Sequence, residues 1–303
     1  MSTLIQANGL SKQYGAKLAL DQVSFEVKKG APVALVGPNG AGKTTLFSLL
    51  CGYIMPTSGS LSIMGHRPGA SALFGKLSAL PQDAQLDPRF SIAHQLTFYG
   101  QLQGLTTKQS QSEALRVLEL VGLAEVAKQR SDDLSHGMRK RVTIGQALIG
   151  KPEIVMLDEA TAGLDPIHAR EVRELVSNLS EEATFILSSH DLTELERLCG
   201  QVLHLDKGKI TEHQANSNIE QTQHHMTILF AENYPNIEQS IQSLAAVNRV
   251  YMSQAKEYVV EYQKTASLFD IELLQYCHQQ GWRYRQLVNG HTLENQIFTQ
   301  EKI

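Results

Sequence analysis

One nine-residue segment near the N-terminus limits the folds open to this chain more than any other feature. It fits the pattern G-x-x-x-x-G-K-[ST] without adjustment, and it lies between an apolar run, Ala34–Val36, and a helical pattern. Glycines let the backbone wrap tightly, so that successive N–H groups and the start of the helix point at phosphate oxygens. The segment therefore predicts a phosphate-binding loop. Its members are Gly37, Pro38, Asn39, Gly40, Ala41, Gly42, Lys43, Thr44 and Thr45.

A second segment supplies the acids that hydrolysis at such a loop requires. Four apolar residues, Ile154–Leu157, predict a buried strand that ends at Asp158 and Glu159. Asp158 would lie beside the phosphates and hold magnesium with the Thr44 hydroxyl, while Lys43 would bridge the β- and γ-phosphates. Glu159 can reach the other side of the γ-phosphate and polarise a water as general base. Loop and acids together predict hydrolysis of a nucleoside triphosphate.

Four shorter motifs narrow the kind of hydrolase, because they occur in a distinctive order. Gln82 lies in Leu-Pro-Gln-Asp, Ser135 in Leu-Ser-His-Gly-Met, Asp165 in Ala-Gly-Leu-Asp and His190 in Ser-Ser-His-Asp. In this order, and with the phosphate loop, they resemble the ATP-binding subunit of an ABC transporter. The resemblance covers roughly the first 215 residues, and its combined motifs are highly specific.

The resemblance implies roles for three side chains around ATP and Mg²⁺, which are the expected cofactors. Tyr14 would stack on adenine, Gln82 would complete the contacts to magnesium and water, and His190 would hold the γ-phosphate and the water beside Glu159. An imidazole can donate to a phosphate oxygen, in agreement with the last role. A packed tyrosine, a solvated glutamine and a helix-capping histidine are the alternatives.

Other matched residues imply that the site is completed by a second copy of the chain. Ser135 and Gly137 would reach the γ-phosphate of ATP bound to that copy, and Asp165 would lie across the dimer seam. The role of the first two agrees with their chemistry, because a Ser-x-Gly turn at a helix start is an anion-binding cap. The family's usual signature is L-S-G-G-Q, but His136 replaces its first glycine and Met138 its glutamine. This altered form is similar to that of bacterial ATPases paired with drug, polysaccharide or antibiotic export permeases. Because histidine titrates near neutral pH, we hypothesise that His136 makes ATP affinity or dimer closure depend on pH.

The chain's patterning predicts the α/β class. From Leu4 to about Asp206, apolar runs of strand length alternate with helical patterns, as in a mostly parallel sheet. Residues 88–133 interrupt this alternation and are predicted to be mostly helical, with Leu115, Leu118 and Val121 on one stripe. We expect an ABC-type P-loop ATPase domain over residues 1–215, with a helical subdomain at about 88–133.

A polar stretch, Thr211–His225, predicts a linker, which we assign to residues 216–225. Residues 226–303 then predict a small accessory α+β domain of ferredoxin-like type, with the order β-α-β-β-α-β. Its role is left open between dimerisation, a regulatory ligand and contact with a permease. The predicted elements are Met226–Ala231, Ile237–Ala246, Val247–Met252, Tyr258–Tyr262, Leu268–His278 and Trp282–Val288, followed by a short helix at Thr292–Thr299.

Composition excludes some partners and compartments. With 27 basic and 31 acidic side chains the net charge is −4, which favours neither nucleic acid nor an anionic membrane. The one basic triplet, residues 139–141, is interpreted as a solvated face or as a contact to ATP and the partner domain. No convincing transmembrane span or secretory signal is present, and the three cysteines lack metal-ligand spacing. We therefore expect a cytoplasmic protein in a reducing compartment.

Two functions follow from these expectations. In the first, two copies sandwich two ATP molecules and drive a separate membrane permease, which the resemblance implies is that of an exporter. The permease would dock at residues 88–133 and hold the chain on the cytoplasmic face of the inner or plasma membrane. In the second, an ABC-type ATPase acts without a transporter in DNA repair or translation. The stretch from Lys43 to Ser135 has no sustained heptads for the long coiled coil of repair proteins, and the chain has one cassette rather than two. Both observations favour transport.

Overall fold

A computed structural model describes residues 2–190, 195, 198–214, 225–263 and 268–290. The chain divides into two compact units, Met1–His213 and Gln214–Ile303, and each is described by itself. The predicted boundary at residue 215 lies close to this division. His225, which the prediction placed in the linker, is instead the first residue of a strand.

The first unit is built on a six-stranded sheet with the order β5-β6-β7-β3-β8-β9. The four neighbouring pairs from β5 to β8 are parallel. All residues of β3, β6 and β7 are buried, as their unbroken apolar runs predict for parallel strands covered on both faces. The strands are β3 (Val33–Val36), β5 (Leu77–Leu80), β6 (Ile154–Leu157), β7 (Thr184–Ser189), β8 (Gln201–Asp206) and β9 (Lys209–Gln214).

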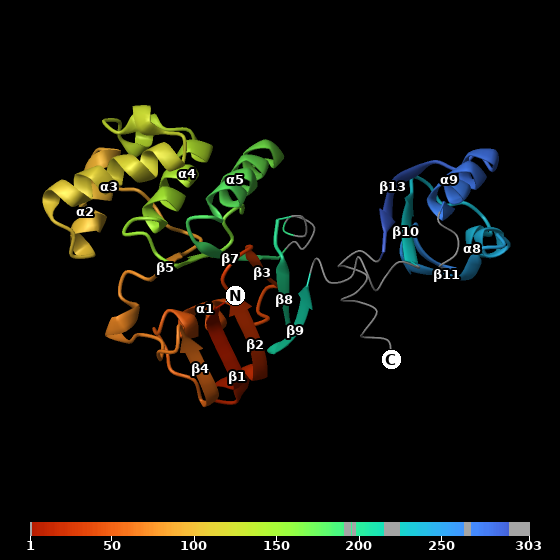
Figure 1. The fold of residues 1–303 in the computed structure, drawn as a ribbon, viewed down its shortest axis with the longest axis horizontal. Helices are drawn as coiled ribbons and strands as arrows, with labels where there is room; N and C mark the ends of the chain where they lie inside the picture. Colours follow the sequence, from red (N-terminus) through yellow and green to blue (C-terminus); the bar gives the residue numbers. More distant parts are fainter. Residues whose placement is uncertain (1, 191–194, 196–197, 215–224, 264–267, 291–303) are drawn as a thin grey trace. The chain divides into compact units, whose positions relative to one another are not determined.

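A smaller antiparallel sheet with the order β2-β1-β4 packs on the same core (Figure 1). It consists of β1 (Thr3–Tyr14), β2 (Lys17–Lys28) and β4 (Ser58–Ile63). Helix α1 (Lys43–Leu50) buries Leu46 and Leu49 in one cluster with residues of both sheets. The start of α1, where the phosphate loop ends, is therefore fixed by the main core.

The predicted helical subdomain contains α2 (Ile92–Leu102) and α3 (Thr107–Leu120), which pack against each other (Figure 1). Local signals set the starts of both helices: Ser91 caps α2, and Thr106 forms a capping box with Gln109. The predicted stripe was wrong in one position, because Leu115 is 49% exposed. Its neighbour Ala114 is buried instead, which turns the apolar face of α3 by one residue.

Helices α4 and α5 follow the insertion. Helix α4 (His136–Ala147) is capped by the Ser135 side chain, which accepts a hydrogen bond from the Met138 N–H at 3.2 Å. Helix α5 (Pro166–Leu179) is capped by Asp165 and has proline at its first position, where the missing N–H costs nothing. The motifs of Ser135 and Asp165 thus both lie at helix starts.

The second unit is a four-stranded antiparallel sheet with the order β11-β12-β10-β13. Phe230 anchors its core with rings of Tyr258 and Trp282 set edge-on at 5.8 and 5.7 Å. The predicted closing helix at 292–299 lies outside the described residues, and α8 ends at Gln242 rather than Ala246. The elements are β10 (His225–Phe230), α8 (Ile237–Gln242), β11 (Val247–Gln254), β12 (Glu257–Tyr262), α9 (Phe269–Gln279) and β13 (Tyr284–Asn289).

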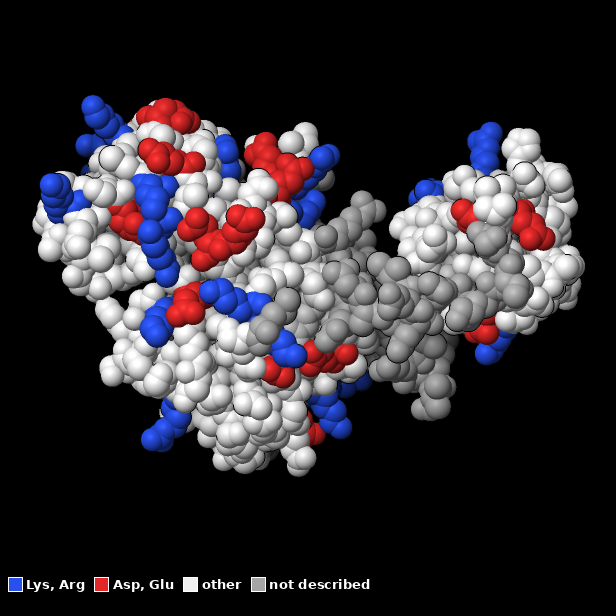
Figure 2. All heavy atoms as spheres, viewed as in Figure 1, with Lys and Arg blue, Asp and Glu red and all other residues white. Residues whose placement is uncertain are grey.

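Acidic and basic side chains are interspersed on the face of the molecule that Figure 2 shows, without an extended field of one sign. Among the described residues, no helix is long and apolar enough to cross a bilayer.

Candidate functional site

Strand order brings the predicted motifs to one edge of the parallel sheet. The phosphate loop follows β3, Gln82 follows β5, Asp158 and Glu159 follow β6, and His190 follows β7. Because β5, β6, β7 and β3 are parallel neighbours, their carboxyl ends meet at the same edge. That edge is where open α/β sheets bind ligands.

The phosphate loop has glycine where its path leaves no room for a side chain. A Cβ at Gly37 would approach the Leu205 carbonyl oxygen to 2.1 Å, and one at Gly42 would approach the Ala19 carbonyl oxygen to 2.6 Å. Gly42 also has a φ of +117° as the residue before α1. The backbone N–H groups at the start of this helix can therefore face a bound anion.

Lys43 closes over this loop. Its Nζ donates to the Gly37 carbonyl at 2.6 Å and to the Pro38 carbonyl at 3.3 Å, and the residue is 7% exposed. A phosphate in the loop would offer this ammonium a charged acceptor in place of two neutral carbonyls.

The two acids lie directly beyond the buried strand β6. The Asp158 N–H continues the ladder to the Leu80 carbonyl at 2.9 Å, whereas Glu159 adopts a left-handed φ of +45°. A non-glycine residue in that region carries about 1–3 kcal/mol of strain, which is typical of functional sites. The Glu159 carboxylate is only 15% exposed, and its Oε1 lies 3.8 Å from His190 Nδ1. The predicted base and the predicted phosphate-binding histidine are therefore neighbours.

Ser188 connects the acids to strand β7, a contact that the sequence alone did not indicate. Its hydroxyl donates to Asp158 Oδ1 and accepts from the Glu159 N–H at 2.9 Å. The Ser-Ser-His-Asp motif includes this serine, but nothing in the sequence distinguishes it from its neighbour.

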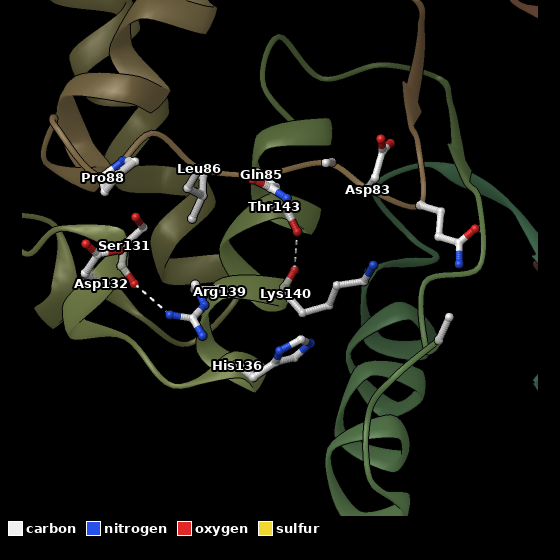
Figure 3. A pocket seen from close by; sticks show the side chains of 13 residues that line it. Asp83, Gln85, Leu86, Pro88, Ser131, Asp132, His136, Arg139, Lys140 and Thr143 are labelled. Atoms are coloured by element: carbon white, nitrogen blue, oxygen red, sulfur yellow. Dashed lines mark hydrogen bonds between the residues drawn. The ribbon is translucent and has the colours of Figure 1, made fainter.

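The first turn of α4 faces a cavity of about 440 Å³ together with the loop after β5 (Figure 3). Gln82, His136 and Lys140 line it. The basic triplet 139–141 is half-buried, so its interpretation as a solvated face is wrong: Arg139 bonds the Ser131 carbonyl at 3.3 Å, as Figure 3 shows. Burial lowers the pKa of Lys140, and the charge of Asp158 opposes this shift. Lys140, which lines the cavity, therefore lies within electrostatic reach of Asp158, the predicted magnesium acid.

Tyr14 lies at the end of β1 with 48% of its surface exposed, and Lys12 Nζ is 5.1 Å from the centre of its ring. An exposed ring is available for stacking on adenine. That contact stays a prediction.

The two predicted dimer motifs touch each other through His168. A Cβ at Gly137 would lie 2.5 Å from His168 Cδ2, so the imidazole packs directly on the glycine. Asp165 accepts from the N–H groups of Ile167 and His168 at 3.0 and 3.1 Å, and its Oδ2 lies 2.5 Å from His168 Nδ1. The hydrogen bond to Asp165 raises the pKa of His168, and the same bond lowers the pKa of Asp165. Sequence reasoning identified Asp165 and Gly137 but missed the histidine between them.

This pair predicts a pH-dependent contribution to stability. Because the pKa of His168 is raised, its contribution is complete below the ordinary histidine pKa and is lost as pH rises through the higher folded value. Because the pKa of Asp165 is lowered, its contribution is lost only as pH falls through that lower value. Glu171 favours the charged imidazole and Arg141 opposes it.

We expect His168→Gln to lower the melting temperature most between about pH 4 and pH 6.5, the ordinary pKa values of the two groups, and less above pH 8. Melting temperatures measured across this range would show the difference, with His66→Gln, a change at another exposed histidine, as control. A difference between His168→Gln and the parent that stays constant with pH would contradict the assignment.

Comparisons with known proteins agree on one family. A family model described as "ABC transporter" matches residues 20–162. The linearmycin resistance ATP-binding protein LnrL of Bacillus subtilis is 37% identical over 210 residues, 68% of this chain and 68% of its own length. The Nod factor export ATP-binding protein I of Cupriavidus metallidurans is 37% identical over 213 residues, 69% of this chain and 70% of its own.

Solved structures share the fold of the first unit. The cassette CbiO1 from Clostridium perfringens, part of the transporter complex CbiONQ, superposes with a TM-score of 0.67 at 24% identity, covering 73% of this chain and 92% of its own. A dimeric cassette, MJ0796, bound to ADP and Pi, superposes with a TM-score of 0.61 at 22% identity, covering 71% of this chain and all of its own. At these identities the likeness concerns the fold.

Proposed function

This chain belongs to the ABC transporter family as an ATP-hydrolysing, ATP-binding subunit, and from that premise we propose that two copies close on two ATP molecules to drive export through a separate membrane permease. The relatives named for linearmycin resistance and Nod factor export support export as the direction. Because the relatives are named for resistance and export, we do not retain the alternative function, an ATPase of DNA repair or translation.

The observation that carries this proposal is the gathering of the phosphate loop and the motifs of Gln82, Glu159 and His190 at one sheet edge. The Ser135–Gly137 turn does not follow a strand of this edge but lies at the start of α4. The chain has one phosphate loop and one such turn. A second copy would supply the missing half of each site: its Ser135, His136 and Gly137 would face the γ-phosphate, with Asp165 at the seam. ATP-dependent dimerisation is thus part of the proposed mechanism.

Within one copy, Lys43 and the loop N–H groups would hold the phosphates, and Tyr14 the adenine. Thr44, Gln82 and Asp158 fit magnesium, because hydroxyl, amide and carboxylate oxygens are its preferred ligands and Asp158 is held at the edge where the loop ends. Bound magnesium would neutralise charge on the phosphates.

Glu159 would orient the attacking water and accept its proton, since its carboxylate is largely shielded from solvent. His190, at 3.8 Å from that carboxylate, would donate to the γ-phosphate and keep the water in place.

The helical subdomain offers a surface for a permease. Phe90, Phe98 and Leu102 are 43, 52 and 59% exposed on or just before α2, and large exposed apolar side chains mark interaction sites. Docking there would hold the chain at the cytoplasmic face of the membrane.

Affinity purification of the tagged chain in detergent tests the proposal. We expect it to recover a protein with several membrane spans, and we expect Phe98→Ser to reduce that recovery at least several-fold while ATP hydrolysis persists. Ile271→Ser, which changes a similarly exposed apolar residue in the second unit, serves as control. Recovery of ribosomes or DNA in place of a membrane protein would contradict transport.

A further inference from the structure

Strand β7 extends past its neighbour β6 at the site. Their last paired residues are Leu157 and Leu187, and β7 continues to Ser189. On its other side, Ser188 pairs with Leu35 of β3, the strand that leads into the phosphate loop. Ser188 therefore lies beside Asp158 and Glu159, the two acids that follow the end of β6.

The Ser188 hydroxyl replaces the strand pairing that β6 no longer provides. Its one hydrogen goes to Asp158 Oδ1, and a lone pair on the same oxygen accepts the Glu159 N–H at 2.9 Å. A hydroxyl has a single hydrogen, so donation to the carboxylate fixes the direction of both bonds. The residue is 3% exposed, which leaves little access for a competing water.

The second of these bonds restrains a strained residue. Glu159 has a φ of +45°, and such a conformation persists only where its surroundings determine it. The hydrogen bond from its N–H to Ser188 is one such restraint, and it acts on the backbone that carries the carboxylate facing His190.

We propose that Ser188 is a positioning residue, which ties the carboxylate of Asp158 and the backbone of Glu159 to strand β7 so that the magnesium acid and the general base keep one fixed arrangement. This rests on the proposed function, because it takes those two roles as given. Without the hydroxyl, Asp158 loses its charge-assisted donor and the Glu159 N–H loses its acceptor.

The chain offers a matched pair of substitutions and a control. Ser188→Thr keeps the hydroxyl, whereas Ser188→Val has nearly the shape of threonine and lacks it. Thr184 lies at the other end of the same strand, is 2% exposed and accepts a hydrogen bond from the Gly30 N–H at 3.2 Å. Thr184→Val therefore removes a buried hydroxyl from β7 away from the site.

Groups that orient metal ligands typically contribute about 10–100-fold to metal affinity or activity. For Ser188→Val we expect kcat to fall by about this factor and the magnesium concentration at half-maximal activity to rise. Binding of a fluorescent ATP analogue should be unchanged without magnesium and should gain less from added magnesium than in the parent. Ser188→Thr should restore most of kcat and of the magnesium response, and Thr184→Val should lower only the melting temperature.

Two results would overturn the proposal: equal kcat and magnesium response in Ser188→Val and the parent, or equal losses in the threonine and valine variants, which would point to packing. A parent chain that neither binds nor hydrolyses ATP would remove the proposed function and this inference together. A parent that does both, with an unaffected Ser188→Val, would remove only the inference.

Discussion

A Glu159→Gln variant should bind ATP as the parent does and hydrolyse it about 10²–10⁴-fold more slowly, the usual contribution of a positioned general base. Glutamine has the size of glutamate, so the hydrogen bond from its N–H to Ser188 and the turn beyond β6 should persist. What disappears is the carboxylate that lies 3.8 Å from His190 and can take the proton of the attacking water. The defect should therefore appear in kcat rather than in binding.

The same variant should accumulate a closed dimer, because in the proposed cycle hydrolysis reopens the two copies. Light scattering after size exclusion, with ATP and magnesium present, would measure this. Glu153→Gln is the matched control, since Glu153 precedes the same strand at its opposite end. Hydrolysis at the parent's rate would exclude Glu159 as the base, and a persistent monomer with ATP bound would contradict the proposed dimer.

Sequence predicted the parts of the site that depend on short spacing. The phosphate loop is a strand, a glycine-rich turn and a helix in direct succession, so its residues determine it locally. The α/β class was confirmed for a similar reason, because unbroken apolar runs such as β6 and β7 require burial on both faces. Once those strands are parallel neighbours, Gln82, Glu159 and His190 must reach the same edge.

Contacts that depend on how elements pack could not be predicted. The contacts of Ser188 with Asp158 and Glu159 arise because β7 extends past β6, and the relative length of the two strands is set by the whole sheet. The contact of His168 with Gly137 depends on where α5 packs against α4. Leu115 was assigned to the wrong face of α3 because one turn of helix offers two neighbouring apolar stripes, and packing selects between them.

A Lys43→Ala variant should weaken nucleotide binding itself, in contrast to Glu159→Gln. The Lys43 ammonium is held at 2.6 Å by the Gly37 carbonyl, inside the loop that would receive the phosphates. A hydrogen bond to a charged group contributes about 1.5–3 kcal/mol, so ATP affinity should fall about 10–100-fold. Alanine is the best helix former at this first position of α1, and it removes a buried charge, so the chain without nucleotide should keep its melting temperature.

Melting curves with and without ATP separate these two effects, because a ligand stabilises the folded state in proportion to the logarithm of its concentration over Kd. At an ATP concentration about 100-fold above the parent's Kd, the parent should gain about 2.7 kcal/mol of stability. Lys43→Ala should reach a similar stabilisation only at an ATP concentration that is higher by the factor by which its affinity has fallen. Lys207→Ala, which removes the same charge from a side chain that is 90% exposed, should behave as the parent. If Lys43→Ala gained the parent's full shift at the parent's ATP concentration, the loop would bind phosphate without its lysine, and the assignment of Lys43 would be wrong.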